Sequence, residues 1–292
     1  MQTILITGCK GQLGRELAKQ LGADGNNKLV LTVIEELDIT DAAQVYARMR
    51  EVKPDVVINC ASYTNVDACE HNVDLCYRVN AVGARNLAVA SKEAGAMMVQ
   101  LSTDYVFGGE GVRDEDGTIR AYVETDRPGP VNVYGKSKLT GEEMVRVHNP
   151  RHIIFRTAWL FGEGNNFVRT MLTMARDHDS VTVVNDQWGN PTSTKELARL
   201  MLDVMRRSEY GLFHATCEGV CTWYEFACEI FRLKGMPTKV VPCTTAEYPR
   251  PALRPRYSML DNRAACLHGA YTMAHWKDAL KEYLSGAGGN VC

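Results

Sequence analysis

Tyr134 and Lys138 are four residues apart in the stretch Tyr-Gly-Lys-Ser-Lys. Its continuation to Val147 has helical spacing, so both side chains should project from one face of a helix. A free phenol has a pKa near 10, and lowering it to about 7 requires roughly 4 kcal/mol of preference for the phenolate. One ammonium at ~4 Å, with an effective dielectric of ~20, supplies about that much. The pair could therefore give a proton to a carbonyl that is being reduced, or take one in the reverse direction.

A surface tyrosine above a helical lysine is the alternative for this pair taken alone. Of the 12 tyrosines, however, Tyr134 is the one with a lysine four residues later. Further hydroxyls follow the apolar run 96–101, in the stretch Ser102-Thr103-Asp104. Thr103 could donate a hydrogen bond to the oxygen that becomes negative during reduction. A Ser-Thr pair at the end of a strand can equally be a helix cap or a turn.

Three spaced glycines near the N-terminus predict a site for a pyrophosphate. Ile4 to Thr7 reads as a buried strand, and Leu13, Leu17 and Leu21 form one stripe of a following helix. Gly8 permits the tight turn, Gly11 lets the backbone approach the phosphates, and Gly14 allows close packing of the helix. The alternative is a glycine-rich turn that binds nothing, because three glycines by themselves are a weak signal.

Strands and helices alternate through the first half of the chain. Apolar runs predict further strands at 28–33, 55–59, 96–101 and 152–156. Helical patterns lie between them at 41–49, 75–94 and 134–147. This alternation requires crossover helices and predicts an α/β fold with a Rossmann-type, doubly wound parallel sheet. Ligands bind beyond the carboxyl ends of such strands, which here are followed by 8–13, 60–64, 102–107 and 157–161.

The second half of the chain is less regular and predicts a smaller C-terminal substrate lobe. We expect a dinucleotide-binding domain at 1–160 and a mainly substrate-binding lobe at 161–292, with segments near 181–184 and 212–215 returning to the sheet. The connection 108–130 is rich in Gly, Asp, Glu and Pro and has no sustained periodicity. A connection of that length predicts either a functional lid or disorder.

Composition excludes several classes of protein. The net charge is -2, which offers no basic surface for nucleic acid or an anionic membrane. No apolar run approaches the ~18 residues that would span a bilayer, so we expect a cytoplasmic protein. The ten cysteines include no Cys-x-x-Cys pair, which argues against a disulfide framework. Cys217 and Cys221 have no nearby histidine cluster, and we expect no metal site there.

With the glycine loop, Thr103 and Tyr134/Lys138 in that order, the chain resembles the extended short-chain dehydrogenase/reductase superfamily. Within it the chain is similar to the dTDP-4-dehydrorhamnose reductases. Further stretches carry this resemblance, which covers essentially the whole chain: Leu37-Asp38-Ile39-Thr40-Asp41, Asn59 to Asp67, Ser102 to Phe107, Tyr134 to Glu142, Arg156-Thr157-Ala158-Trp159, Asp186 to Thr192, and Arg254-Pro255 with Ser258 and Leu260.

The resemblance implies NAD(P)H-dependent reduction of the 4-keto group of dTDP-4-dehydro-6-deoxy-L-mannose to dTDP-L-rhamnose, with Thr103, Tyr134 and Lys138 as the catalytic set. It places these further residues along the cofactor, together with Tyr134 and Lys138: Gly8, Lys10, Gly11, Gln12, Leu13, Gly14, Asp38, Ile39, Ala61, Ser62, Tyr63 and Thr64. Thr103, Asp104 and Trp159 would line the substrate site, and we expect Asn166 there as well.

Three other side chains have both a functional and an ordinary interpretation. Trp159 and Trp188 follow a strand end or lie in the irregular lobe, which favours a surface for a sugar or a base over mere core packing. Arg254 could bind the substrate's phosphates bidentately. It could equally be an ordinary surface arginine in a proline-rich loop.

Cofactor choice and metal use depart from the family pattern. The end of the second strand, near Val33, lacks the acidic residue that would bind a ribose 2′-hydroxyl, whereas Lys10 or Arg15 could meet a 2′-phosphate. We therefore expect NADPH, with tolerance for NADH. Some members of the family hold Mg²⁺ through glutamates at a dimer contact. Glu16 and Glu196 match, but the terminal Gly-Gly-Asn-Val-Cys offers no third carboxylate, so Mg²⁺ is doubtful and a homodimer stays open.

Other functions remain possible on the same residues. Related nucleotide-sugar dehydratases have an acidic pair after the threonine, but here Tyr105 follows Asp104. The regulatory subunit of methionine adenosyltransferase is also similar to this family, so a dinucleotide-binding subunit without catalysis is one alternative. Another nucleotide-sugar epimerase/reductase is the other.

Overall fold

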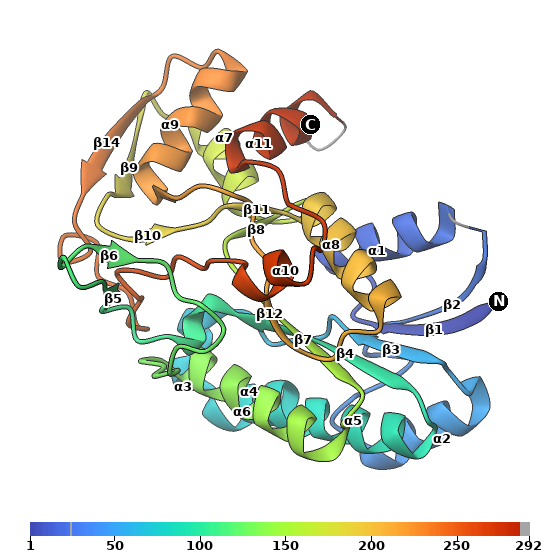
Figure 1. Ribbon diagram of the computed structural model, residues 1–292. Coiled ribbons are helices and arrows are strands. Elements are labelled where there is room, and N and C mark those ends of the chain that lie inside the picture. The colour runs from blue at the N-terminus through green and yellow to red at the C-terminus, as the bar shows by residue number, and fades with distance from the viewer. Residues whose placement is uncertain (24, 287–292) are drawn as a thin grey trace.

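A six-stranded parallel sheet forms the centre of the molecule, with the strand order β12-β7-β4-β3-β1-β2 (Figure 1). The computed structural model describes residues 1–23 and 25–286. The sheet strands are β1 (Gln2–Thr7), β2 (Asn27–Thr32), β3 (Val56–Asn59), β4 (Met97–Thr103), β7 (His152–Thr157) and β12 (Gly211–His214). The predicted doubly wound parallel sheet is therefore confirmed. The chain runs from β1 to β2 and then back across β1 to β3, and this reversal opens a crevice at the carboxyl ends of β1 and β3.

Both faces of the sheet are covered by helices, as the nearly continuous apolar strands require. On one face, α2 (Ala42–Val52), α5 (Ala84–Glu93) and α6 (Val133–His148) cover Leu5, Val57, Met98 and Ile154. On the other, α1 (Gln12–Ala23) and α8 (Thr194–Arg207) cover Ile4, Ile58, Val99 and Phe155. Neighbouring residues of one strand thus belong to two separate cores, because successive side chains point to opposite faces.

The predicted single helix over 75–94 is wrong in detail. The segment contains the end of α4 (Val73–Tyr77), a π-helical turn η1 (Arg78–Gly83) and then α5, and a separate short helix α3 (Val66–His71) precedes it. The side chain of Asn80 in this turn accepts hydrogen bonds from Ser62 Oγ (2.9 Å) and Tyr63 N (2.8 Å). The irregular turn therefore holds the loop that follows β3.

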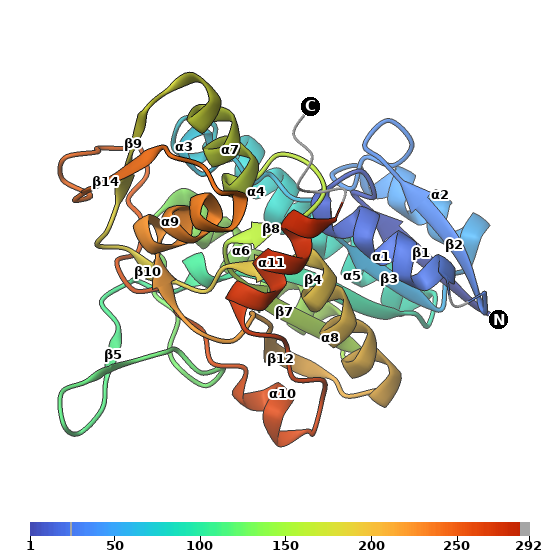
Figure 2. The same ribbon diagram turned by 90° about the horizontal axis from the view of Figure 1, so that it is seen from above.

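Smaller elements build the second lobe, which Figure 2 shows beside the sheet. These are β8 (Leu160–Phe161), α7 (Phe167–Asp177), β9 (Ser180–Val184), β10 (Trp188–Gly189), β11 (Thr192–Ser193), β13 (Cys221–Thr222), α9 (Trp223–Lys234), β14 (Lys239–Cys243), α10 (Arg263–Leu267) and α11 (Trp276–Ser285). The predicted return of 212–215 to the central sheet matches β12. The predicted return of 181–184 is wrong, because β9 pairs with β14 in a separate sheet.

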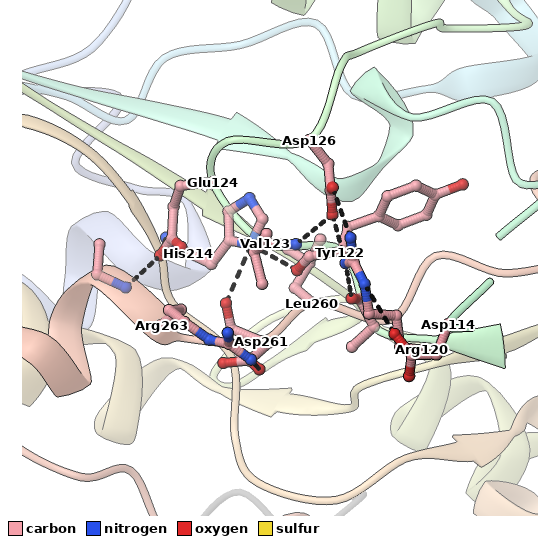
Figure 3. Close-up of polar contacts among 12 residues, drawn as sticks. Asp114, Arg120, Tyr122, Val123, Glu124, Asp126, His214, Leu260, Asp261 and Arg263 are labelled. Carbon is pink, nitrogen blue, oxygen red and sulfur yellow. Dashed lines mark hydrogen bonds and ion pairs between the residues drawn. The ribbon is translucent and has the colours of Figure 1, made fainter. Parts of the chain in front are cut away.

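The connection 108–130 is neither disordered nor a free lid. It forms a hairpin of β5 (Val112–Arg113) and β6 (Ile119–Arg120), preceded by a short helical turn η2 (Asp104–Val106). Arg120 binds Asp126 bidentately at 2.6 and 2.8 Å, and His214 Nδ1 lies 3.0 Å from the Tyr122 carbonyl and 3.2 Å from that of Asp261 (Figure 3). This network ties the connection to both the sheet and the second lobe.

Two observations from the sequence concern membrane-spanning segments and the glycine-rich C-terminus. The described helices include none that is long and apolar enough to cross a membrane. The glycine-rich C-terminal residues 287–292 lie outside the described part of the chain.

A buried ion pair joins α6 to the sheet. Glu142 on α6 accepts hydrogen bonds from Arg156 Nε (2.8 Å) and Nη2 (2.7 Å) on β7, and from Ser102 Oγ (2.5 Å) on β4. The side chains of Glu142 and Arg156 are 0% and 1% exposed. Arg156 also lies over the Phe107 ring at 5.1 Å. Since water cannot replace either partner, breaking this pair leaves an uncompensated buried charge.

We expect Glu142→Gln to lower the free energy of unfolding by about 3–5 kcal/mol, the usual cost of removing one partner of a buried pair. Urea denaturation followed by circular dichroism measures this change. The matched control is Glu51→Gln, which removes the exposed pair with Arg48 and should change stability by less than about 1 kcal/mol. Equal losses in the two variants would contradict the role given to Glu142.

Candidate active site

A cavity of about 610 Å³ lies at the carboxyl ends of the central strands. Its walls come from the glycine loop, the segments that follow β3, β4 and β7, the start of α6, and the start of α9. The lining residues are Lys10, Gly11, Gln12, Leu13, Gly14, Cys60, Ser62, Thr64, Val66, Leu101, Ser102, Thr103, Asp104, Tyr105, Tyr134, Lys138, Thr157, Ala158, Trp159, Leu160, Glu163, Gly164, Asn165 and Trp223.

The glycine loop has the tight geometry that a pyrophosphate site needs. Gly8 has a φ of +64°, and a Cβ there would lie 2.7 Å from Ala61 N. A Cβ on Gly14 would lie 2.5 Å from the Gly8 carbonyl oxygen, so the start of α1 can approach the loop only without a side chain. The first amides of α1 have no partners within the helix and attract anions. These residues therefore fit the phosphates of a dinucleotide.

Tyr134 and Lys138 stand on the first turns of α6 and both line the cavity. Asn132 caps this helix by accepting from Gly135 N at 2.8 Å. Lys138 Nζ donates to the Leu101 carbonyl at 2.6 Å and lies 3.4 Å from Ser62 Oγ. Burial lowers the pKa of the Lys138 amine to about 8.

The sequence-based expectation that Lys138 lowers the pKa of Tyr134 is wrong for this structure. Burial raises the pKa of the Tyr134 phenol above its ordinary value, and the opposing influence is a hydrogen bond with Thr103. Lys138 Nζ is directed to a main-chain carbonyl instead. The Tyr134 hydroxyl consequently stays protonated at neutral pH, which suits a group that gives up a proton.

Thr103 is the last residue of β4, and its hydroxyl is held by its neighbours. It donates to Asp104 Oδ1 at 2.8 Å and accepts from Tyr105 N at 3.2 Å. Because a hydroxyl has one hydrogen, Thr103 cannot donate to Asp104 and to a second oxygen at the same time. Thr103 must therefore rotate away from Asp104 before it can donate to a substrate oxygen.

Asp104 is a buried carboxyl, 2% exposed, on the wall of the cavity. Burial raises its pKa to about 6, against the nearby hydroxyls of Thr103 and Ser258, which lower it. Its Oδ2 atom is buried and has no hydrogen-bond partner among the described residues. An unpaired acceptor beside the cavity can take a ligand hydroxyl once the neighbouring side chain of Thr103 has moved.

Many of the predicted site residues meet in this one cavity. From the cofactor set these are Lys10, Gly11, Gln12, Leu13, Gly14, Ser62, Thr64, Tyr134 and Lys138; from the substrate set they are Thr103, Asp104 and Trp159. Gly8, Asp38, Ile39, Ala61 and Tyr63 do not line it. Gly8 and Ala61 pack together behind the loop, and Asp38 Oδ1 accepts from Thr40 N at 2.9 Å.

Three predicted substrate residues lie outside the cavity. Asn166 caps α7 and its amide nitrogen donates to Gln12 Oε1 (3.1 Å) and to the Gly162 carbonyl (2.7 Å). Trp188 belongs to β10 in the second lobe. Arg254 binds Asp67 bidentately at 2.8 and 3.0 Å. The guanidinium that was predicted to bind phosphates is therefore already paired with a carboxylate.

The sequence missed Trp223, which enters the cavity wall from α9. It also did not single out Glu163, Gly164 and Asn165, which follow β8. The polar residues after strand ends could be found by their position, and Cys60, Ser102 and Thr157 were within the stretches marked for that reason. No local pattern marks Trp223, because its partner Trp159 is 64 positions earlier in the sequence.

Arg15 and Lys10, the two residues that could bind a 2′-phosphate, differ in their contacts with the rest of the protein. Arg15 donates to the Lys10 carbonyl at 2.8 Å and pairs with Glu163 at 2.6 Å. Lys10 is exposed at the tip of the loop, and the neighbouring Cys9 N donates to Thr32 O at the end of β2. Lys10 is therefore the better placed of the two.

The carboxylates considered for Mg²⁺ have protein partners. Glu16 accepts from Gln20 at 2.7 Å. Glu196 binds Arg199, the Tyr271 hydroxyl and Ala274 N at 2.6, 2.9 and 2.8 Å. Across residues 1–23 and 25–286, no group of three or more His, Cys, Asp or Glu could hold a metal ion.

We expect Asp104→Asn to stabilise the fold at neutral pH. Because burial raises the pKa of Asp104 from 3.8 to about 6, ionising it above pH 6 costs up to about 3 kcal/mol of stability. The cost is absent below the unfolded-state pKa near 4, where both states are protonated. Urea denaturation at pH 7 and pH 4 should show the gain at pH 7 only. The control variant, Asp116→Asn at an exposed position, should give no gain in the free energy of unfolding. An equal gain for Asp104→Asn at pH 7 and pH 4 would contradict the raised pKa of Asp104.

Comparison with known proteins assigns the chain to a family. The family model described as RmlD substrate binding domain matches residues 1–287. The chain is 40% identical over 285 residues to the spore coat polysaccharide biosynthesis protein SpsK of Bacillus subtilis, covering 97% of each chain. A crystal structure of a dTDP-4-dehydrorhamnose reductase from Clostridium acetobutylicum is similar at a TM-score of 0.93 and 50% identity, over 97% of this chain and 98% of that one.

A second similar structure is of a protein in complex with a cofactor. The dTDP-4-dehydrorhamnose reductase of Bacillus anthracis, in complex with NADP, matches at a TM-score of 0.92 and 38% identity, over 97% of this chain and 99% of that one. The family model and both solved structures match this chain over nearly its full length. The chain belongs to the dTDP-4-dehydrorhamnose reductase family.

Proposed function

We propose that this protein is an NADPH-dependent oxidoreductase that reduces the 4-keto group of dTDP-4-dehydro-L-rhamnose to give dTDP-L-rhamnose. The observation that carries the proposal is the convergence of Tyr134, Lys138 and Thr103 with the glycine loop on one cavity. The reductases of Clostridium acetobutylicum and Bacillus anthracis support it, and the latter binds NADP. Tolerance for NADH remains part of the proposal.

When bound, NADPH would supply a hydride for the keto carbon. The chain's own residues hold it: amides at the start of α1 receive the pyrophosphate, and Lys10 meets the 2′-phosphate. Lys138 and Ser62, with Nζ and Oγ 3.4 Å apart, are placed to bind the ribose hydroxyls. Since Lys138 is buried, its ammonium also makes the site positive beside the oxygen that becomes negative.

Tyr134 provides the proton. As the keto carbon becomes tetrahedral, its oxygen gains negative charge and the protonated phenol of Tyr134 delivers a hydrogen to it. Thr103, once rotated from Asp104, donates a second hydrogen bond to that oxygen. The released Asp104 carboxylate then accepts a hydroxyl of the hexose, because its Oδ2 atom lacks a partner among the described residues.

We also propose the division of labour predicted from the sequence, with residues 1–160 holding the dinucleotide and the lobe after 160 forming the sugar side. Trp223 supports this division, because it enters the wall of the cavity from α9 of that lobe. The described cysteines all carry free thiols, which supports a reducing compartment, the cytoplasm.

We expect Tyr134→Phe to abolish reduction, with kcat at least about 10³-fold lower, because the phenol that supplies the proton is lost. The assay is the fall in NADPH absorbance with dTDP-4-dehydro-L-rhamnose. Fluorescence titration should show unchanged NADPH binding in the variant. Val133→Ala, one residue earlier on α6, is the matched control and should keep most of the activity.

The alternatives give different results in the same assay. NADPH binding without turnover of any keto-sugar nucleotide would favour a regulatory dinucleotide-binding subunit. Solvent deuterium entering the carbons beside the carbonyl would favour an epimerase/reductase. Full activity in Tyr134→Phe would leave the proposed reduction without its proton donor.

We expect kcat/KM for the keto sugar to fall above pH 8. The pKa of Lys138 is lowered to about 8 by burial, so its positive charge is present below that pH and is lost above it. The Tyr134 phenol, whose pKa is raised, does not contribute to this limb. A pH profile of initial rates with NADPH tests the assignment. Lys138→Arg, which stays charged, should lose the alkaline limb in its residual activity; a limb that persists there would contradict it.

A further inference from the structure

Trp223 stands beside Trp159 on the wall of the cavity. Their rings are stacked, with centroids 3.6 Å apart and planes within 8° of parallel. Trp223 is backed by Phe167, at a ring distance of 4.6 Å, and by the aromatic core of the second lobe. One face of the Trp159 indole is therefore covered by a firmly seated ring.

Gly189 covers the opposite face. A Cβ on Gly189 would lie 2.4 Å from Cε2 of Trp159 and 2.7 Å from both Cζ2 and Nε1. An atom approaching in the ring plane would come closer to the two flanking atoms than to Cε2, so these distances place it above the plane. Because Trp223 fills one face at van der Waals distance, the Gly189 backbone packs on the other.

One small sheet brings both covers to the indole. Strand β10 pairs with β13, with Gly189 opposite Cys221, and Trp223 follows β13 directly as the first residue of α9. The helix start is fixed by a capping box, in which Glu225 N donates to Thr222 Oγ1 and Thr222 N donates to Glu225 Oε2. The two covers therefore cannot separate without breaking this local structure.

The backbone of Trp159 is constrained as well. Its φ of +45° is in the left-handed region, which a bulky residue rarely adopts. Such a conformation persists where the surroundings determine it, and here the Trp159 carbonyl accepts from Thr192 N at 3.1 Å. With both faces covered, Trp159 offers the cavity its edge, which is the electropositive part of an aromatic ring.

We propose that Trp223 and Gly189 are positioning residues of the substrate site, which hold Trp159 edge-on so that the hexose meets the rim of the indole and not its face. This inference rests on the proposed function, since the keto sugar is the ligand that would meet the rim. The rim favours sugar oxygens, whereas an open face would favour the apolar C–H side of a ring. It replaces the sequence-based expectation of a stacking surface at Trp159.

The stacking itself is tested by circular dichroism, without any substrate. Two stacked indoles whose transition dipoles are rotated against each other within their planes give an exciton couplet in the far ultraviolet. We expect Trp223→Phe and Trp159→Phe each to abolish the couplet, and Trp276→Phe, in the core of the lobe, to retain it. A couplet that survives in Trp223→Phe would overturn the inference.

The positioning role is tested by kinetics on the same proteins. Trp223→Leu should raise the KM for dTDP-4-dehydro-L-rhamnose roughly five- to tenfold, the usual worth of a stacked aromatic pair, and leave the KM for NADPH unchanged. Trp223→Phe should recover part of the loss. Gly189→Ala, which pushes Trp159 from the other face, should raise the same KM. Trp276→Phe removes core aromatic surface and should alter neither KM.

The outcomes separate this inference from the proposed function. If the wild-type protein reduces the keto sugar but Trp223→Leu and Gly189→Ala leave its KM unchanged, the inference is overturned and the reductase stands. If the KM for NADPH rises in parallel, the residues are merely structural and the inference is also overturned. If the wild-type protein does not turn over the keto sugar, the proposed function fails, and the positioning role fails with it.

Discussion

The geometry of the site depends on the carboxylate of Glu142. Helix α6 carries Tyr134, Lys138 and Glu142 at intervals of four residues, so all three lie on the face that meets the sheet. Glu142 is bound by Arg156 of β7 and by Ser102 of β4. It therefore fixes the rotation of the helix against the two strands whose ends carry Thr103 and Trp159. A buried pair of this kind contributes little net stability but specifies orientation, which is what the proton donor that we propose at Tyr134 requires.

The sequence predicted the parts of the fold that depend on local patterns. The strands of the central sheet are short apolar runs, and Asp41 and Gly8 to Gly14 mark their helices by capping and turn chemistry. It failed where the deciding contact is distant in the chain. The connection 108–130 has no periodicity, and Arg120 binds Asp126 within it, yet Tyr122 and Glu124 anchor it to residues 90 or more positions away. Arg254 is taken by Asp67, 187 positions earlier, for the same reason.

In the candidate site, too, local patterns were predicted from the sequence and contacts between distant residues were not. The glycine loop, the Tyr-Lys spacing and the hydroxyls after β4 could be recognised because each is defined by residues that are close together in the sequence. The effect of Lys138 on Tyr134 could not, since a pair at i and i+4 shares a helix face but each side chain still selects its own partner. In the folded chain that partner is the Leu101 carbonyl for Lys138 and Thr103 for Tyr134. Proximity on a helix therefore predicted that both residues line one cavity, but not the direction in which the pKa of Tyr134 is shifted.

The two lobes are joined on both sides of the cavity, which bears on how a ligand is selected. At the glycine loop, Asn166 binds Gln12 and Glu163 binds Arg15. On the far side, Tyr122 pairs with Leu260 and stacks on Phe107 at 4.0 Å. These contacts hold the two lobes together in the free protein, so walls of the cavity that are already in place can select the ligand. The unpaired Oδ2 of Asp104 and the clamped edge of Trp159 are such walls. Each costs stability in the free protein, and that cost is the sign of a site prepared in advance for its ligand.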